Sequence, residues 1–313
     1  MRQPKVSAYY TARPAPAPIA RAPDEDYQFV DCFSGIGGAS TGAAQAGLRV
    51  VLAIDSDKHM LAVHELNHPE ATHMNIELPP KQPLPLPKAG KWHLHGSPPC
   101  NKVSRINQDV TPEQRKHGLS LVRWYLKFAL ASNATTFSME QVPAECVLKV
   151  VKKFKRRHPG KLDYCVVNCY DLGVPQTRKR LIAGTPVLID RLRRRRAVRK
   201  SVADVIAEPG GTHTRIEATA SGTKACRVLN SWDDFCRPIG RPAATVTARN
   251  GLRWATPFSG VEPHKMATRD LLAIQSFPPD YELGKLSRTN GRKGAGNALP
   301  PLAMRELLRP LRP

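Results

Sequence analysis

Residues 96–104, GSPPCNKVS, hold a cysteine in surroundings that do not suit a structural role. Cysteines that serve only in packing behave as small hydrophobes and sit among apolar residues. Cys100 instead follows two prolines and precedes polar residues, among them Ser104. A thiol held on a stiff turn can act as a nucleophile once it loses its proton. Cys100 is therefore the first candidate catalytic residue.

A glycine turn between two apolar segments is the second candidate feature. Residues 27–57 read as a buried strand, the turn SGIGG, a small-residue helix and a second buried strand ending at Asp55. This order is typical of a nucleotide-binding βαβ unit, in which such an acid binds a ribose diol. Gly35 and Gly37 fit the dinucleotide pattern GxGxxG, but Ser40 replaces its third glycine. A nicotinamide oxidoreductase is therefore disfavoured.

The remaining apolar and amphipathic stretches place these two features in an α/β fold. Strands and helices alternate to about residue 190, and helical periodicity returns after residue 265. The segment between them is rich in Gly, Thr and Ser and offers only short strand-like pieces. We expect a disordered Pro/Ala-rich tail over 1–26, an α/β domain over 27–190, a small irregular domain over 191–265 and a return to the first domain over 266–313.

The charge balance favours a polyanionic partner. Lys and Arg number 48 against 26 Asp and Glu, which gives a formal net charge of +22. The basic residues are densest over 149–158 and 191–200, and two dense clusters indicate nucleic acid. A membrane surface is the weaker alternative, because the arginine-rich cluster lacks the apolar face of an interfacial helix. No apolar run reaches the length of a transmembrane helix.

Cysteine usage indicates an intracellular, reducing compartment. The 7 cysteines form no dense framework, so we expect the cytoplasm or nucleoid, or the nucleus in a eukaryote. Cys165 and Cys169 do not form a CxxC pair, and Cys226 and Cys236 are too far apart to complete a usual zinc knuckle. We therefore expect no metal ion.

Six short motifs follow one another along the chain. They are FSGIGG (33–38), PPC with Ser104, MEQVP (139–143), QTRKR (176–180), RPAATVTAR (241–249) and GNALPP (296–301). In this order they resemble the motifs of the DNA cytosine-5 methyltransferases, over roughly residues 28–185 and 266–313. The resemblance implies an α/β, Rossmann-like domain that uses S-adenosylmethionine (AdoMet), over 27–190. It makes the segment over 191–265 a small target-recognition domain.

The resemblance gives the loop thiol a reaction. Cys100 would add as thiolate to C6 of cytosine so that C5 can attack a methyl group, and nearby positive charge would lower the pKa of the thiol. Glu140 would meet N3, Arg180 would serve on the base side and Arg178 would anchor the site. The base must leave the stack of double-stranded DNA, and the loop over 101–117 would close over it. The basic clusters would contact the phosphates.

The resemblance also assigns cofactor contacts. Phe33 would lie near the adenine, Gly35 and Gly37 would let the backbone approach, and Asp55 would hold the ribose. Asn297 would contact the methionine end or the ribose side. The cofactor implied is AdoMet, with S-adenosylhomocysteine as the product.

Four features depart from the family pattern. Gln141 replaces an asparagine that supports the nucleophile loop, and Asn75 replaces an acid that meets adenine, although an amide can still pair with that base. Ser56 stands where the family has an aromatic wall. The distinctive part of the recognition region, 207–241, is short, which predicts a short or relaxed target sequence.

Three further readings compete with a DNA methyltransferase. RNA is the alternative substrate, although the Cys-Phe-Thr signature of the tRNA-methylating branch is absent. A catalytically silent DNA-binding homologue is favoured by Gln141 and Asn75 and disfavoured by the intact set of Cys100, Glu140 and Arg180. The dehydrogenase reading is the weakest. We expect a monomer, because one flipped base needs one pocket; the target sequence and a restriction-modification role stay open.

Overall fold

The computed structural model describes most of the chain outside the N-terminus. The expected tail over 1–26 and the loop over 101–110 lie outside the described residues, as does about two thirds of the expected recognition segment over 207–241. Descriptions below cover residues 27–100, 111–206, 227–230, 233–238, 240–248, 253–255 and 264–309.

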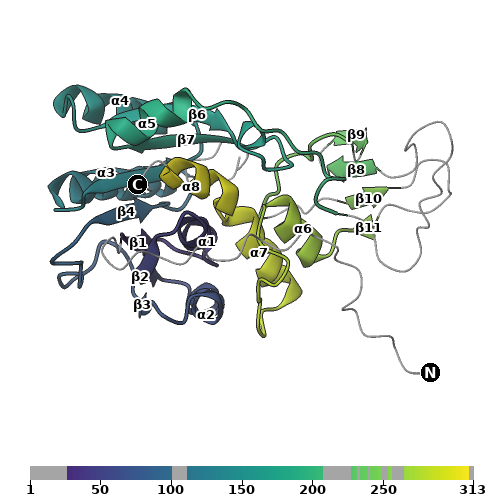
Figure 1. The fold of residues 1–313 in the computed structure, drawn as a ribbon, viewed down its shortest axis with the longest axis horizontal. Coiled ribbons are helices and arrows are strands. Elements are labelled where there is room, and N and C mark those ends of the chain that lie inside the picture. The colour runs from purple at the N-terminus through teal and green to yellow at the C-terminus, as the bar shows by residue number, and fades with distance from the viewer. Residues whose placement is uncertain are drawn as a thin grey trace.

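A seven-stranded sheet forms the centre of the protein, in the order β3-β2-β1-β4-β5-β7-β6 (Figure 1). The five strands from β3 to β5 are parallel, and β7 runs antiparallel to both of its neighbours. The strand order reverses between β1 and β4, where doubly wound folds bind ligands. The Rossmann-like prediction is confirmed. The strands are β1 (Gln28–Cys32), β2 (Arg49–Asp55), β3 (Thr72–Asn75), β4 (Trp92–Gly96), β5 (Thr136–Gln141), β6 (Asp163–Asn168) and β7 (Lys179–Gly184).

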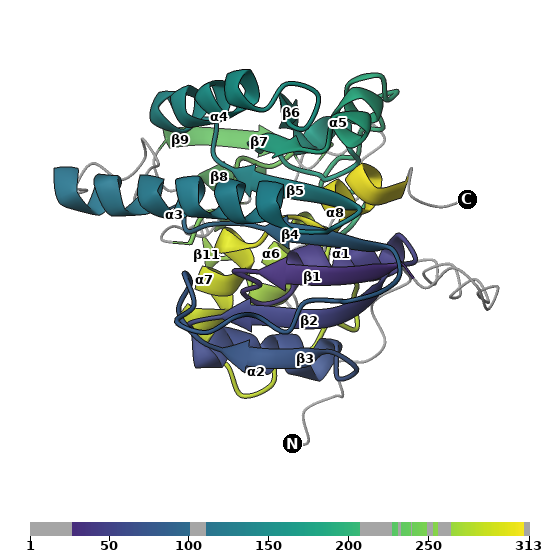
Figure 2. The same cartoon turned by 90° about the vertical axis from the view of Figure 1, so that its left-hand side faces the viewer.

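Helices cover both faces of this sheet (Figure 2). α3 and α4 share one apolar cluster with the sheet, whereas α1, α5 and α8 share a second cluster that includes strand residues. Because both faces are buried, the central strands read as continuous apolar runs. The helices are α1 (Gly38–Gln45), α2 (Lys58–Asn67), α3 (Pro112–Ala131), α4 (Glu145–Arg157), α5 (Pro186–Arg193), α6 (Thr268–Ile274), α7 (Arg288–Asn297) and α8 (Pro301–Leu308), with a 3-10 turn, η2 (Cys169–Asp171).

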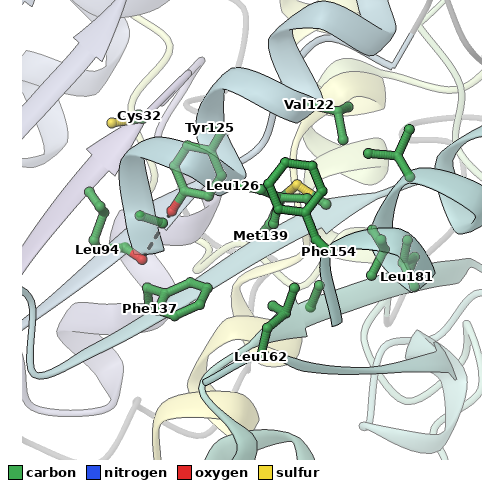
Figure 3. Packing of buried hydrophobic residues seen from close by; sticks show 14 of the residues in the cluster. Cys32, Leu94, Val122, Tyr125, Leu126, Phe137, Met139, Phe154, Leu162 and Leu181 are labelled. Atoms are coloured by element: carbon green, nitrogen blue, oxygen red, sulfur yellow. Dashed lines mark hydrogen bonds between the residues drawn. The ribbon is translucent and has the colours of Figure 1, made fainter. Parts of the chain in front are cut away.

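Tyr125 fixes α3 against β4, which leads into the loop of Cys100, and against β5, which carries Glu140 (Figure 3). Its hydroxyl donates to the carbonyl of Leu94 on β4 or of Ser138 on β5, at 3.1 and 2.8 Å. A Cβ added to Gly96 would lie 2.2 Å from the Tyr125 ring, so only glycine fits beneath it. The aromatic ring therefore sets the height of the helix above the end of β4.

The C-terminal helix α8 returns to the first helix of the fold. A Cβ added to Gly42 of α1 would lie 2.3 Å from the carbonyl oxygen of Pro301, and one added to Gly38 would lie 2.2 Å from that of Leu299. Only glycine permits this approach between α1 and the start of α8. The first and last of the described helices thus pack as neighbours.

A second, four-stranded antiparallel sheet, in the order β11-β10-β8-β9, stands apart from the large one (Figure 1). The expected domain over 191–265 is only partly separate, because Val202, Ala243 and Val246 are buried in a cluster with α6. That domain boundary stays a prediction. The strands are β8 (Arg227–Asn230), β9 (Asp233–Pro238), β10 (Arg253–Ala255) and β11 (His264–Lys265).

Two helical regions differ from the expectations. α3 begins at Pro112, so residues 112–117, which were expected to belong to the closing loop over 101–117, are helical and that part of the prediction is wrong. Thr111 and Gln114 form a capping box at the start of this helix. α7 forms from the sequence RTNGRKGAGN, in which glycine content hides the helix. Within the described part of the chain, no helix is long and apolar enough to cross a bilayer.

Candidate active site

The carboxyl ends of β1, β2, β4 and β5 surround a cavity of about 380 Å³. The predicted site residues among its lining are Phe33, Gly35, Asp55, Cys100, Glu140 and Asn297. The predicted site residues outside the lining are Gly37, Asn75, Arg178 and Arg180. The structure therefore brings the candidate nucleophile and the glycine turn to the same cavity.

Asp55 holds the glycine turn in place. One carboxylate oxygen accepts from the backbone N–H of Gly35 and the other from that of Asp57, both at 2.8 Å. Gly35 has a φ of 54° and Gly37 a φ of 89°, in the left-handed region that favours glycine. A Cβ on Gly37 would also lie 2.9 Å from the hydroxyl of Tyr281. The two glycines are required by the shape of the turn.

A buried polar chain that the sequence analysis missed lies beneath this turn. Asp31 lines the cavity, accepts from the hydroxyl of Ser40 at 2.7 Å, and leaves its Oδ1 without a partner in the structure. Burial raises the pKa of Asp31 to about 7. His64 links Ser40 to the half-buried His73, with 2.8 Å at each ring nitrogen. An acid ending an apolar strand was the signal for Asp31.

The helix α3 packs against Phe33 and contributes to the lining of the cavity. Phe33, which has a φ of 62°, meets the ring of Trp124 edge to face with 6.2 Å between ring centroids. His117 and Leu121, also on α3, line the cavity. Trp124 is not part of that lining, so it supports Phe33 from behind and does not replace the aromatic wall expected at Ser56. Helical spacing had predicted α3 but not which of its residues face the cavity.

Asn75 contacts a neighbouring strand. Its side-chain amide donates to the backbone carbonyl of Asp55 at 3.0 Å, and the residue is exposed. The cavity is lined instead by the two residues that follow, Ile76 and Glu77. Glu77 thus brings an acid to the cavity two positions beyond the expected one.

Gln141 supports the nucleophile loop. Its amide nitrogen donates to the carbonyl of Pro98 at 2.9 Å, and its amide oxygen accepts from the N–H of Val142 at 2.7 Å. The side chain is fully buried. The extra methylene of glutamine therefore still allows a bridge to the proline turn before Cys100.

Glu140 and Arg180 form a buried ion pair beside the thiol. The Nε of Arg180 lies 2.6 Å from a carboxylate oxygen of Glu140, and each side chain is about a tenth exposed. Arg180 also donates to the carbonyl of Lys179 at 2.8 Å. In the antiparallel pairing of β5 with β7, Glu140 lies opposite Ile182, which is two residues from Arg180 along the same strand. The side chains of Glu140 and Arg180 therefore lie on the same face of the sheet and meet. Each of the two charged groups therefore holds the other in place.

The expected activation of the thiol by nearby charge is not the dominant effect here. Burial raises the pKa of Cys100, the charge of Arg180 opposes that rise, and the charge of Glu140 adds to it. Removing a thiolate from water costs more than the neighbouring guanidinium returns. The prediction of a lowered pKa is therefore wrong for this structure.

Arg178 joins three backbone segments. Its guanidinium donates to the carbonyls of Val246, Gly296 and Ala298 at 2.7, 2.9 and 3.0 Å. Gln176, in the same motif, accepts from the N–H of Val246 at 3.0 Å. Burial lowers the pKa of Arg178 to about 9. This geometry matches the predicted anchoring role and does not bring Arg178 to the cavity.

The last turn of α7 completes the rim of the cavity. Asn297 and Lys293 both line it, and the ammonium of Lys293 pairs with Asp57 at 3.1 Å. Lys293 was missed from the sequence because the helix that carries it was not predicted. Among the described residues, no group of three or more His, Cys, Asp or Glu is arranged to hold a metal ion.

The geometry agrees with a comparison against known families. The model of the C-5 cytosine-specific DNA methylase family matches residues 27–185, about half of the chain. This range holds the glycine turn, the Cys100 loop and the Glu140–Arg180 pair. The chain belongs to this family. The family resemblance drawn from the six motifs is thereby confirmed.

The chain covers some of its relatives almost completely and others only in part. It is 29% identical to the type II methyltransferase M.XorII of Xanthomonas oryzae over 49% of this chain and 39% of that protein. It is 25% identical to M.MthTI of Methanothermobacter thermautotrophicus over 90% of this chain and 95% of that one. The S. pombe Dnmt2 methyltransferase has a similar fold, with a TM-score of 0.58 at 16% identity over 92% of this chain and 100% of that chain.

Proposed function

We propose that this protein transfers a methyl group from AdoMet to C5 of cytosine in double-stranded DNA. One observation carries the proposal beyond family membership. Cys100 and Glu140 line the same cavity as the glycine turn and Asp55. A group bound at the turn and a base presented to the thiol would therefore share one enclosed space.

The residues of the turn fit AdoMet. A Cβ on Gly35 would meet nothing within 4 Å, so the backbone there is open to a ligand. Each oxygen of Asp55 accepts one hydrogen bond and keeps a lone pair for a ribose hydroxyl. Phe33 offers an aromatic surface for the adenine, and Asn75 acts by holding β2 and β3 together. When bound, AdoMet supplies an electrophilic methyl group. Asn297 would contact its methionine end.

Cys100 provides covalent catalysis. Its sulfur bonds to C6 of the cytosine, the C5–C6 double bond opens, and its electrons make C5 a nucleophile. The Glu140 carboxylate takes the proton of the Cys100 thiol and passes it to N3, and Arg180, held against Glu140, meets the developing charge on O2. After the transfer, which would leave S-adenosylhomocysteine, the C5 proton goes to water, the Cys100–C6 bond breaks, and the proton on N3 returns to the sulfur. Arg178 is a positioning residue because its contacts are all to backbone carbonyls.

The target base must leave the helix to reach Cys100. Extrusion costs a few kcal/mol, which contacts to the DNA backbone must offset. The loop over 101–110, which includes Ser104, is proposed to close over the base. The recognition segment over 207–241 is proposed to recognise the DNA sequence. The loop and the greater part of the recognition segment lie outside the described residues. A recognition segment this short predicts a short or relaxed target sequence. Bisulfite mapping that returns a long, strict target sequence would refute that prediction.

The decisive experiment compares the wild type with Cys100→Ser and Cys100→Ala. Tritiated methyl transfer to duplex DNA should fall by at least about 10³-fold in both variants, because the covalent route is lost. Duplex containing 5-fluorocytosine should form a covalent complex with the wild type only. Undiminished transfer by Cys100→Ala would disprove the mechanism. Faster transfer to tRNA than to DNA would establish the RNA alternative, and no transfer to either would establish the silent homologue.

A further inference from the structure

The helix α4 presents a cationic face that the catalytic mechanism does not use. Its apolar residues, Val147, Val150, Val151 and Phe154, are buried against the sheet. The opposite face carries basic residues at helical spacing, all of them exposed: Lys149, Lys152, Lys153 and Arg156. The sequence cluster over 149–158 is thus concentrated on the solvent side of one helix.

The two basic clusters of the sequence differ in how their charge is used. In the cluster over 191–200, carboxylates pair with four of the arginines: Arg193, Arg194, Arg195 and Arg199. On α4, within the described part of the chain, ion pairs hold only Lys149 and Lys155. Lys152, Lys153, Arg156 and Arg157 have no carboxylate partner among the described residues. Unneutralised, exposed cations attract a polyanion, whereas paired ones do so weakly.

A hollow lies beside these free cations. Its volume is about 460 Å³, and its basic lining residues are Lys152, Lys155 and Arg156. Leu162 and Tyr164 give it an apolar floor, and the ammonium of Lys155 lies 5.7 Å from the Tyr164 ring centroid. Cationic rims around an apolar floor match the alternating phosphate and sugar groups of a nucleic-acid backbone.

The hollow stands at the opposite edge of the large sheet from Cys100. α4 begins just after Glu140 at the catalytic edge, and its 13 residues carry the chain about 20 Å away from it. The hollow includes Leu162, immediately before β6, whose first residue pairs with the last residue of β7. Figure 1 shows α4 on the side away from the four-stranded sheet. A straight duplex at the catalytic cavity would therefore not reach this face.

We propose that the α4 surface, comprising Lys152, Lys153, Lys155, Arg156 and Arg157, binds the phosphate backbone of a second segment of duplex DNA. This replaces the expectation that the cluster over 149–158 contacts the duplex being methylated. The choice of DNA rests on the proposed function; the existence of a second polyanion site rests on the charge pattern and the hollow. Binding at this surface is independent of sequence, because it involves phosphates and not base edges.

The test counts duplexes bound per chain. A duplex of about 12 base pairs is roughly 40 Å long and occupies one site. Sedimentation of the full chain at low salt should give two duplexes for the wild type and one for Lys152→Glu/Arg156→Glu. The matched control, Lys81→Glu/Lys88→Glu, makes the same change in charge on the connector between β3 and β4 and should still bind two. One duplex for the wild type, or two for the α4 variant, would overturn the proposal.

Two further arms separate this proposal from the proposed function. Methyl transfer to the short duplex should be the same for the α4 variant and the wild type, since that duplex fills the cleft alone. A wild type that binds two duplexes but transfers no methyl group refutes the proposed function and leaves the second site standing. If tRNA, or vesicles containing phosphatidylserine, displace the second duplex at lower phosphate concentration than duplex DNA does, the assignment to DNA is overturned.

Discussion

The two edges of the large sheet handle charge in opposite ways. At the catalytic edge the charged groups are buried and fixed, with Glu140 against Arg180 and Arg178 against three carbonyls. At the edge beyond α4 the cations are exposed, and most of them have no carboxylate partner in the part of the chain that the structure describes. Removing a buried charge leaves its partner unpaired in a site without water, which is strongly destabilising, whereas removing an exposed charge costs little stability. Chemistry therefore belongs at the first edge, and adjustable, salt-sensitive binding at the second.

The largest effect is expected from Glu140→Gln. The substitution keeps the size of the side chain but removes both the proton donor and the charge that holds Arg180. Methyl transfer should fall by about 10²- to 10⁴-fold, the range typical of general acid catalysis. Single-turnover kinetics on duplex DNA measures this, with the melting temperature as the control for folding. Retained activity would show that the catalytic edge is as tolerant as the α4 surface.

Arg178→Gln should mainly cost stability. The variant leaves the carbonyls of Val246, Gly296 and Ala298 without donors in a buried setting. We expect the free energy of unfolding to fall by about 3–5 kcal/mol, as for other broken buried charge networks. Urea denaturation measures the fall. Arg178→Lys keeps a cation but loses the guanidinium fork, so it should recover only part of the loss. Full recovery of stability by lysine would contradict the role of the guanidinium in joining the three backbone segments.

Acidification should destabilise the protein below about pH 6.5. Burial lowers the pKa of His68 to about 4 and that of His95 to about 3, and it holds the pKa of His64 and His93 well below the usual value. These histidines take up protons on unfolding, so their contribution to stability is lost as the pH falls from 6.5 towards the folded pKa values.

Asp31 acts in the opposite sense to these histidines. Its folded pKa of about 7 means that the folded state holds a proton between about pH 4 and 7 that the unfolded state lacks. Burial also raises the pKa of Asp55. Two acids against four histidines still leave a net loss of stability on acidification, and each net proton is worth about 1.4 kcal/mol per pH unit. Urea midpoints at pH 6.5 and 5.5 test this; equal midpoints would contradict it.

The smallest effect is expected on α4. Lys153→Ala removes an exposed cation with no recorded carboxylate partner among the described residues, so the urea midpoint should not change measurably. DNA affinity at low salt should fall slightly, and the slope of log affinity against log salt should decrease by up to about 0.9. A loss of stability in this variant would show that the far edge is not the tolerant surface described here.

The parts of the site that could be predicted were those fixed by local sequence. Short motifs contain or adjoin the glycine turn, Asp55 and Cys100, and the residue types in these motifs indicate the local geometry. Strand pairing brought Glu140 and Arg180 together without changing the prediction for either.

The parts that could not be predicted depend on contacts between distant segments. The partners of Arg178 lie 68 to 120 residues along the chain, and no local pattern names them. Glu77 and Lys293 face the cavity because of how β3 ends and how α7 packs. The pKa of Cys100 depends on burial, which a nearby arginine in the sequence does not reveal.

The contact between α1 and α8 has a consequence for synthesis on the ribosome. Gly42 packs directly on Pro301, so the helix that follows the glycine turn lacks its natural cover until the last of the described helices has emerged from the exit tunnel. A nascent chain halted before α8 would carry the glycine turn, Asp55 and Cys100 without that cover. Such stalled fragments should therefore not retain a ligand at the glycine turn, and binding there would begin only once α8 has folded onto α1.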